Sequence, residues 1–219
     1  MICLDINGVL LLKRQKQIRS VEQYLINCGY DSDIINKTLQ DLNPHNFGSV
    51  FTKTKWFMDL KDEVYNELRI YKLIAKQIDP KRKNFGLELF IATSSFSQIH
   101  MPSVVPRCLK KLYNLDKLIL ISDASISVKC FLQKYNIQKY FKDIYLSCEF
   151  GFGKFNDMFF NKIRSLYKNE VLYYLDDNKF NIANAEKYGI NGFWLNKSGG
   201  DVKNLQEFVH VMENIYGNK

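Results

Sequence analysis

The sequence has few of the residues that characterise several classes of metal-binding and secreted protein. Its three histidines are too scattered for a histidine-based metal cage, and its five cysteines include no CxxC pair. The odd number and wide spacing of these cysteines argue against a zinc ribbon or a disulfide framework. Cysteines used in this way are typical of a reducing compartment.

Long hydrophobic segments are missing as well. No apolar run approaches the ~20 residues that a membrane-spanning helix requires, so we expect no membrane segment. The chain does not open with a charged region followed by a long apolar stretch, so we expect no signal peptide. Together with the cysteine usage, these absences predict a cytoplasmic protein.

The composition is that of a soluble globular protein, with 46% hydrophobic and 25% charged residues. At 219 residues the chain can form one sizeable domain, or a core domain with a smaller insertion. The net charge of +8 either serves solubility or attracts anionic partners such as phosphorylated metabolites. Its basic clusters are short and no nucleic-acid reader motif is recognisable, which argues against nucleic acid as the partner. The oligomeric state stays open.

Short apolar runs bounded by polar or turn residues recur along the chain and are typical of buried parallel strands. Helical patterns over 128–141, 155–168 and 181–190 separate the last four runs, and another over 202–216 closes the chain. This alternation predicts an α/β fold, a doubly wound parallel Rossmann-like sheet with right-handed crossovers. The five predicted strands cover residues 1–5, 117–122, 143–147, 171–177 and 192–196.

A long helical stretch interrupts this alternation after the first strand. Apolar positions recur at helical spacing over 20–29, 32–42 and 59–78, and Ser20 and Ser32 are candidate N-caps. We therefore predict an α/β core domain from residues 1–13 and 86–219, with a helical insertion over 14–85. Residues 87–96 leave two alternatives, an extra strand or the start of a helix that ends near Leu115.

Polar side chains follow the predicted strands at their carboxyl ends, where ligands bind in open parallel sheets. The first strand ends at Asp5, the second at Ser122 and the fourth at Asp176 and Asp177, while the third leads into SCEFGFGKF with Lys154. Taken singly, each such residue is commonly a turn or cap residue, and GFGK lacks the spacing of a phosphate-binding P-loop. Their shared position predicts a site with three carboxylates, a hydroxyl and an ammonium.

Four segments together resemble the motifs of the haloacid dehalogenase superfamily. LDINGVLL (4–11) is similar to its first motif, DxDGxx, and LILISDAS (118–125) to the second, an apolar run ending in Ser or Thr. The lysine of SCEFGFGKFNDMFF (147–160) is similar to the third motif, and VLYYLDDNKFNIANAEKYGI (171–190) to the fourth, a strand ending in two acids. The resemblance covers 1–12 and about 104–196, and it implies that the insertion is a helical cap domain.

The resemblance implies a phosphatase-type site with a Mg²⁺ cofactor and a small phosphorylated substrate. Asp5 would be the nucleophile that forms an aspartyl-phosphate. The Mg²⁺ ligands would be Asp5, the backbone carbonyl of Asn7, and Asp176, Asp177 or both.

The same resemblance assigns the substrate phosphate to the second and third motifs. Ser122 and Asp123 would be substrate-binding residues, with the Ser122 hydroxyl donating a hydrogen bond to a phosphoryl oxygen. Lys154 would bind it too and offset the negative charge of nucleophile and phosphate together.

Two positions depart from the pattern. Phe155 stands where a proline commonly follows the lysine. Asn7 stands where these phosphatases have an aspartate that protonates the leaving oxygen and then activates water. An amide cannot be a general acid or base, and that catalysis contributes about 10²–10⁴-fold.

Two hypotheses follow for the function. The first is a Mg²⁺-dependent phosphohydrolase or phosphotransferase with Asn7 in a specialised or impaired catalytic site. The second is a catalytically inactive relative that binds a phosphorylated ligand or a protein partner. Dehalogenase chemistry suits the same scaffold, but the paired acids argue against it.

Overall fold

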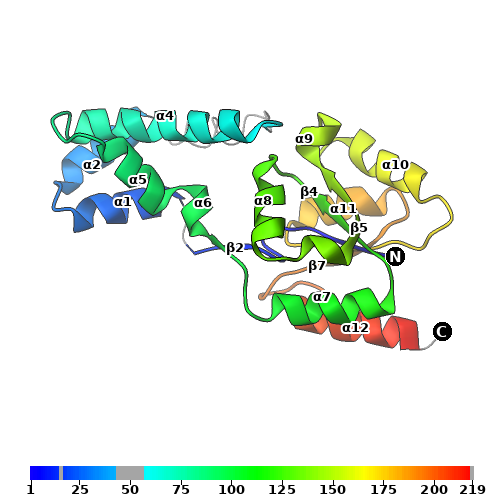
Figure 1. Cartoon of the computed structure of the whole chain (residues 1–219). Helices are drawn as coiled ribbons and strands as arrows, with labels where there is room; N and C mark the ends of the chain where they lie inside the picture. Colours follow the sequence, from blue (N-terminus) through cyan, green and yellow to red (C-terminus); the bar gives the residue numbers. More distant parts are fainter. Residues whose placement is uncertain (15–16, 43–56, 218–219) are drawn as a thin grey trace. The chain divides into compact units, whose positions relative to one another are not determined.

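The computed structural model describes residues 1–14, 17–42 and 57–217. The chain divides into two compact units (Figure 1). The first, here the sheet unit, contains Met1–Leu12 and Met101–Lys219, and the second, here the helical unit, contains Lys13–His100.

A five-stranded sheet forms the centre of the sheet unit, with the order β5-β4-β1-β6-β7 and every neighbouring pair parallel. The prediction of an α/β fold with five parallel strands is confirmed. β1 takes the central position between β4 and β6, so the ends of these three strands lie next to one another. The bounds are β1 Ile2–Leu4, β4 Leu118–Ser122, β5 Phe141–Leu146, β6 Tyr173–Asp176 and β7 Asn191–Trp194.

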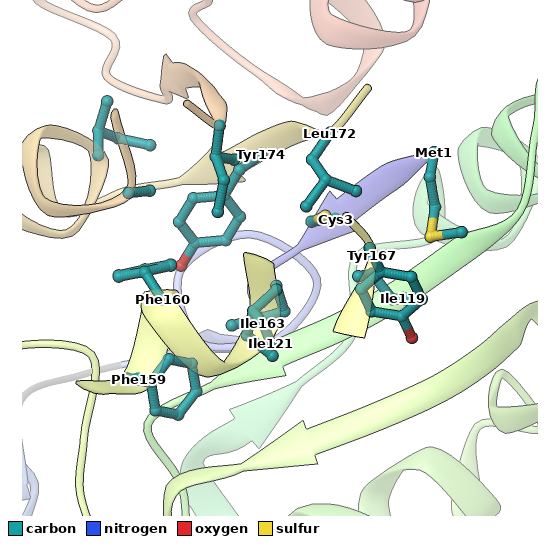
Figure 2. Close-up of a cluster of buried hydrophobic side chains, with 13 residues drawn as sticks. Met1, Cys3, Ile119, Ile121, Phe159, Phe160, Ile163, Tyr167, Leu172 and Tyr174 are labelled. Carbon is teal, nitrogen blue, oxygen red and sulfur yellow. The ribbon is translucent and has the colours of Figure 1, made fainter. Parts of the chain in front are cut away.

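Helices cover both faces of this sheet. Side chains alternate along a strand, so Cys3, Ile119 and Tyr174 share one face. There they pack with Phe159 and Phe160 in a buried cluster (Figure 2). α10 (Asp157–Leu166) and α11 (Lys179–Glu186) supply that cover. α7 (Val105–Leu115) and α12 (Leu205–Gly217) pack together in a separate layer, which Phe208 joins to Phe193 of β7.

One predicted helix of the sheet unit is interrupted. The pattern over 128–141 forms α8 (Ser127–Lys134) and a short 3₁₀ helix, η1 (Gln138–Tyr140). Asn136 lies between them with φ at 52°, a left-handed conformation that a continuing helix does not allow. In the described part of the chain, no helix combines the length and apolar character needed to cross a membrane.

The helical unit has its own hydrophobic core. The core joins α1 (Gln17–Asn27), α2 (Ser32–Asp41), α4 (Leu60–Ile78) and α5 (Phe85–Thr93). Phe85 and Leu89 of α5 are fully buried against this cluster. Residues 86–100, which we assigned to the core domain, therefore belong to the helical unit.

Residues 87–96 follow neither of the two predicted alternatives. They form most of α5 and the start of α6 (Ser95–Gln98). α7 is a separate helix that begins at Val105. A short two-stranded sheet of β2 (Leu12–Lys13) and β3 (Ile99–His100) lies where the chain leaves one unit and returns to it.

Both N-cap predictions in the helical unit are wrong. Ser20 lies inside α1, which begins at Gln17, and it is buried there. Ser32 is the first residue of α2, and Asp31 caps the helix by accepting from the backbone N–H groups of Asp33 and Ile34. A carboxylate at the N-terminus of a helix also interacts favourably with the helix dipole.

Candidate active site

The ends of three neighbouring strands bring the predicted acidic residues together. Asp5 directly follows β1, and its backbone N–H donates to the Leu175 carbonyl of β6 at 3.0 Å. Ser122 and Asp176 are the last residues of β4 and β6. Asp5, Asp176 and Asp177 each place a carboxylate oxygen within 4.8 Å of the others.

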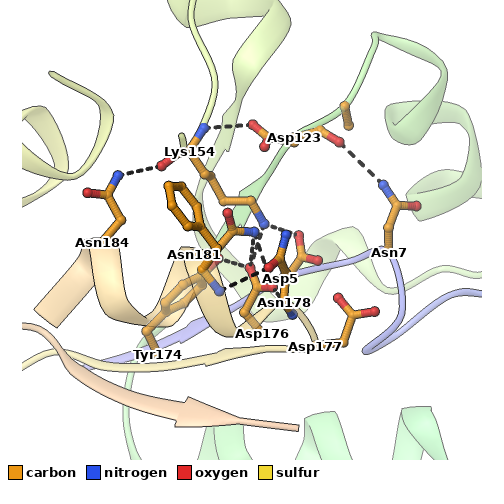
Figure 3. Close-up of polar contacts among 12 residues, drawn as sticks. Asp5, Asn7, Asp123, Lys154, Tyr174, Asp176, Asp177, Asn178, Asn181 and Asn184 are labelled. Atoms are coloured by element: carbon orange, nitrogen blue, oxygen red, sulfur yellow. Dashed lines mark hydrogen bonds and ion pairs between the residues drawn. The ribbon is translucent and has the colours of Figure 1, made fainter. Parts of the chain in front are cut away.

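Lys154 extends into this group from a loop that follows α9 (Ser147–Phe150). Its backbone N–H donates to Asp123 Oδ1 at 2.9 Å, and its carbonyl accepts from Asn184 Nδ2 at 2.7 Å. The ammonium lies 3.0 Å from Asp5 Oδ1 and 2.6 Å from Asp176 Oδ2, and the residue is only 2% exposed (Figure 3). The backbone contacts thus hold the side chain between two buried carboxylates.

Asp176 is fully engaged with the protein. Its Oδ1 accepts from the Asn178 backbone N–H at 2.7 Å, and Asn181 Nδ2 lies 3.2 Å and 3.1 Å from its two oxygens. Its Oδ2 also accepts a hydrogen bond from the Tyr174 hydroxyl in addition to the contact with Lys154. These donors leave Asp176 little capacity for a further ligand.

Burial and neighbouring charges of opposite sign shift the pKa values of Asp5 and Lys154 in opposite directions. Loss of solvent raises the pKa of Asp5 to about 7, against the lowering effect of the Lys154 ammonium, and the nearby Asp176 adds to the rise. Burial alone would lower the pKa of Lys154. The carboxylates of Asp5, Asp176 and Asp123 outweigh that effect and hold this pKa above its usual value.

The remaining predicted site residues have fewer contacts. Ser122 Oγ is buried beside Asp5, where it helps to lower the pKa of that carboxyl, but it has no well-formed hydrogen bond to a described residue. Asp5 Oδ1 contacts the Lys154 ammonium but forms no hydrogen bond within the described ranges. Asp177 is exposed, and Trp194 Nε1 donates to its backbone carbonyl at 3.0 Å.

Asn7 is held by the loop after β4. Its Nδ2 donates to the backbone carbonyl of Asp123 at 3.4 Å, the one side-chain hydrogen bond that Asn7 makes to a described residue (Figure 3). The next residue, Gly8, has φ at 82°, and a Cβ built there would lie 2.0 Å from Asp177 Oδ2. Position 8 therefore needs glycine both for its backbone and for the space that Asp177 occupies.

Four supporting residues of the site were not predicted from the sequence. They contact Asp176 or Lys154 and are Tyr174, Asn178, Asn181 and Asn184. Tyr174 lies two positions before Asp176, and the period of a strand places both side chains on one face. Asn181 and Asn184 are amides on a short helix and are buried, which is uncommon for polar residues without partners.

Solved structures share the overall fold of this chain. A HAD family enzyme from Bacteroides thetaiotaomicron, in complex with magnesium and inorganic phosphate, matches with a TM-score of 0.61 at 17% identity, over 90% of this chain and 94% of that one. The putative HAD-hydrolase YfnB from Bacillus subtilis, bound to magnesium, matches with a TM-score of 0.58 at 16% identity, over 96% and 97%.

A third similar structure is that of an enzyme named for a different reaction. The 2-haloacid dehalogenase from Pseudomonas syringae pv. Tomato DC3000 matches with a TM-score of 0.57 at 14% identity, over 98% of each chain. No protein-family model and no curated protein sequence matches the chain. At these identities the structural similarity establishes the fold alone, and the fold of this chain is that of the haloacid dehalogenase superfamily.

Proposed function

We propose that the chain is a Mg²⁺-dependent phosphohydrolase or phosphotransferase that acts on a small phosphorylated metabolite through an aspartyl-phosphate on Asp5. The observation that carries this proposal is the buried contact of Asp5 with Lys154, beside the carboxylates of Asp176 and Asp177. A carboxylate that attacks a phosphate needs nearby positive charge, because nucleophile and substrate repel each other. Lys154 is placed to offset that repulsion.

The donor set at the strand ends fits Mg²⁺, which prefers oxygen ligands. Asp5, Asp177 and the backbone carbonyl of Asn7 would hold the ion. Asp176 would lie beside them, since its oxygens already accept several hydrogen bonds. When bound, the ion would neutralise charge on the phosphate oxygens. The crystallised HAD enzyme with magnesium and phosphate supports this choice of cofactor and substrate class.

The chain's own residues would then divide the work of binding. The Ser122 hydroxyl interacts with Asp5 without a well-formed hydrogen bond, and it would donate to a phosphoryl oxygen. Asp123 accepts from the Lys154 backbone N–H, so it would support the loop that presents the ammonium. We assign the helical unit, residues 13–100, the role of a cap that selects the substrate. The cytoplasm is the proposed location, in keeping with five free cysteines.

Assays on a panel of phosphate monoesters, with Mg²⁺ and with a chelator, test the proposal. We expect Mg²⁺-dependent release of phosphate from at least one ester, and we expect Asp5→Asn to abolish it. Asp157→Asn is the matched control, since it makes the same change at an exposed residue whose Oδ1 lies 3.6 Å from Lys187 Nζ. Activity that survives Asp5→Asn would contradict the aspartyl-phosphate.

Asn7 favours a second candidate, a catalytically inactive protein that binds a phosphorylated ligand or a protein partner. Calorimetry with inorganic phosphate and Mg²⁺ separates the two candidates. Binding of phosphate by a wild-type chain that is inert on every ester would select the binding protein. Turnover of any ester that depends on Asp5 would select the enzyme.

A further inference from the structure

A groove lies between two helices of the sheet unit, α7 and α12, which pack side by side (Figure 1). α7 leads into β4 and α12 follows β7, and all strands of the sheet are parallel, so the two helices run in the same direction along it. The groove encloses about 350 Å³, which is at the lower end of the range for small-molecule sites. Its described lining includes none of the residues of the candidate active site.

The floor of the groove is apolar. Cys108 of α7 and Val209 of α12 line it and are both 3% exposed, and the partly buried Val104 extends the floor beyond the start of α7. Burial raises the pKa of the Cys108 thiol, so this side chain stays uncharged at neutral pH and packs as a small apolar group. The floor therefore suits a hydrocarbon group.

The rim of the groove carries more positive than negative charge. Glu213 Oε1 lies 2.8 Å from Lys111 Nζ, so this carboxylate already has a cationic partner. Arg107 is exposed, and its guanidinium has no hydrogen bond or ion pair to a described residue. The rim thus presents an unpaired guanidinium directly beside an apolar floor.

The imidazole of His210 lies across the groove from this guanidinium. The contact between Lys111 and Glu213 joins the two helices at one level of the groove. Arg107 precedes Lys111 by four residues and His210 precedes Glu213 by three, which is about one turn in each helix. Because the helices run in the same direction, one turn back along each brings Arg107 and His210 to opposite sides of one stretch of the groove.

We propose that the groove between α7 and α12 binds a small amphipathic anion, with its charged head on Arg107 and His210 and its apolar body on the floor. A guanidinium offers paired N–H donors in one plane, which match a carboxylate or a phosphate. The imidazole supplies a further N–H donor from the other helix. A cationic ligand does not fit the rim, because Glu213 is already paired with Lys111.

Chemical-shift mapping of the full chain, labelled with ¹⁵N and kept in chelator, tests this directly. The anionic probes are hexanoate and hexyl phosphate, and hexylamine has the same body with a cationic head. We expect saturable shifts of amide signals on α7 and α12 with at least one anion, and the tighter anion identifies the head group. Hexylamine should bind at least about tenfold more weakly, because like charges across an interface are costly.

A series of carboxylates from butyrate to hexanoate tests the apolar floor. Each methylene that leaves water for the floor should tighten binding by about fourfold. Binding by charge alone would give the same affinity along the series. The series uses the wild-type chain, so it decides the proposal even where a variant fails to fold.

Arg107→Gln tests the head-group position, and Lys110→Gln is its matched control. Both changes remove one positive charge from an exposed residue of α7, but Lys110 does not line the groove. Loss of the charged hydrogen bonds should weaken hexanoate by about tenfold or more in Arg107→Gln. The change in Lys110→Gln should stay within about twofold, as for other exposed charges that do not contact the ligand.

The failures of this inference and of the proposed function look different. Three results would overturn the inference: no saturable shift with either anion, equal affinity for hexylamine, or equal losses in the two variants. Equal affinity for butyrate and hexanoate would overturn the apolar floor. Each of these results leaves Mg²⁺-dependent ester hydrolysis intact. Conversely, Asp5→Asn should bind hexanoate as the wild type does, because the two sites share no residue.

Discussion

The two sides of the candidate site differ in how completely the protein itself satisfies them. On one side, which we call the fixed side, Lys154 and Asp176 have protein partners for their charged groups and are almost fully buried. On the other, the open side, the Ser122 hydroxyl interacts with Asp5 without a well-formed hydrogen bond, and Asp177 is exposed. Asp5 lies between them, in contact with Lys154.

This difference indicates which groups are scaffold and which are available to a ligand. Buried polar groups without partners cost free energy, so native proteins rarely keep them without a reason. The fixed side is complete without any ligand and places a cation beside Asp5. The open side has unused donors and acceptors, and these are the atoms that a phosphate and a metal ion would engage.

Removing the cation of the fixed side should have the largest effect on stability. Lys154→Ala leaves the carboxylates of Asp5 and Asp176 buried without their shared partner. We expect the free energy of unfolding to fall by about 3–5 kcal/mol, as for other broken buried ion pairs. Guanidinium unfolding in metal-free buffer near neutral pH measures this change.

Lys187→Ala is the matched control for that loss. The Lys187 ammonium lies 3.6 Å from Asp157 Oδ1, and both side chains are more than half exposed. Exposed ion pairs contribute little, so the loss should stay below about 1 kcal/mol. Equal losses of unfolding free energy in the two variants would show that Lys154 does not stabilise the buried carboxylates of the fixed side.

The sequence predicted the elements with strong local signals and missed those that depend on partners distant in the chain. The five strands were predicted because short apolar runs end in polar residues, and the candidate site residues Asp5, Ser122, Asp176 and Asp177 lie at those ends in the structure. The place of residues 86–100 was missed because α5 is mostly apolar and its sequence marks no single buried face. Contacts with α1 and α4 place α5 in the helical unit, and a local sequence pattern does not reveal such contacts.

The role of Asn7 shows the same limit at the site itself. Its departure from the family pattern is visible in the sequence, and the natural interpretation is a lost acid. The hydrogen bond to Asp123 spans 116 positions and could not be inferred from spacing. The buried amides of α11 were missed for the same reason, since their partners Asp176 and Lys154 lie on other elements.

A change next to the open side should alter metal binding more than folding. Gly8 and Gly29 have nearly equal φ values, 82° and 86°, so alanine at either position should cost about 1–2 kcal/mol. At Gly8 the new Cβ would also collide with Asp177 Oδ2, whereas Gly29 has no heavy atom within 4 Å. Asp177 is exposed, so its side chain can move aside at little cost, and thermal melts in chelator should show similar losses for the two variants.

The same melts with Mg²⁺ should separate them. A ligand that binds the native state stabilises it by about 2.7 kcal/mol at a concentration of 100 times its Kd. Wild type and Gly29→Ala should gain stability from Mg²⁺, and Gly8→Ala should gain little because Asp177 has been displaced. An equal gain in Gly8→Ala would remove Asp177 from the proposed ligands.

The smallest effect tests whether the fixed side depends on each of its donors. Tyr174→Phe keeps the ring in the core, where its centroid lies 5.5 Å from that of the Phe160 ring. It removes only the hydroxyl that donates to Asp176. Asp176 retains Lys154 and Asn181, so we expect a loss of about 1–2 kcal/mol in unfolding free energy.

Tyr65→Phe makes the same chemical change on α4 at a residue that is 67% exposed, and it should be near neutral. The difference between the two variants isolates the buried hydrogen bond from the effect of losing a hydroxyl. A Tyr174→Phe loss no larger than that of Tyr65→Phe would mean that Lys154 and the asparagine amides hold Asp176 without it. Lys154 would then be the main partner of Asp176, and Tyr174 would contribute to the hydrophobic core alone.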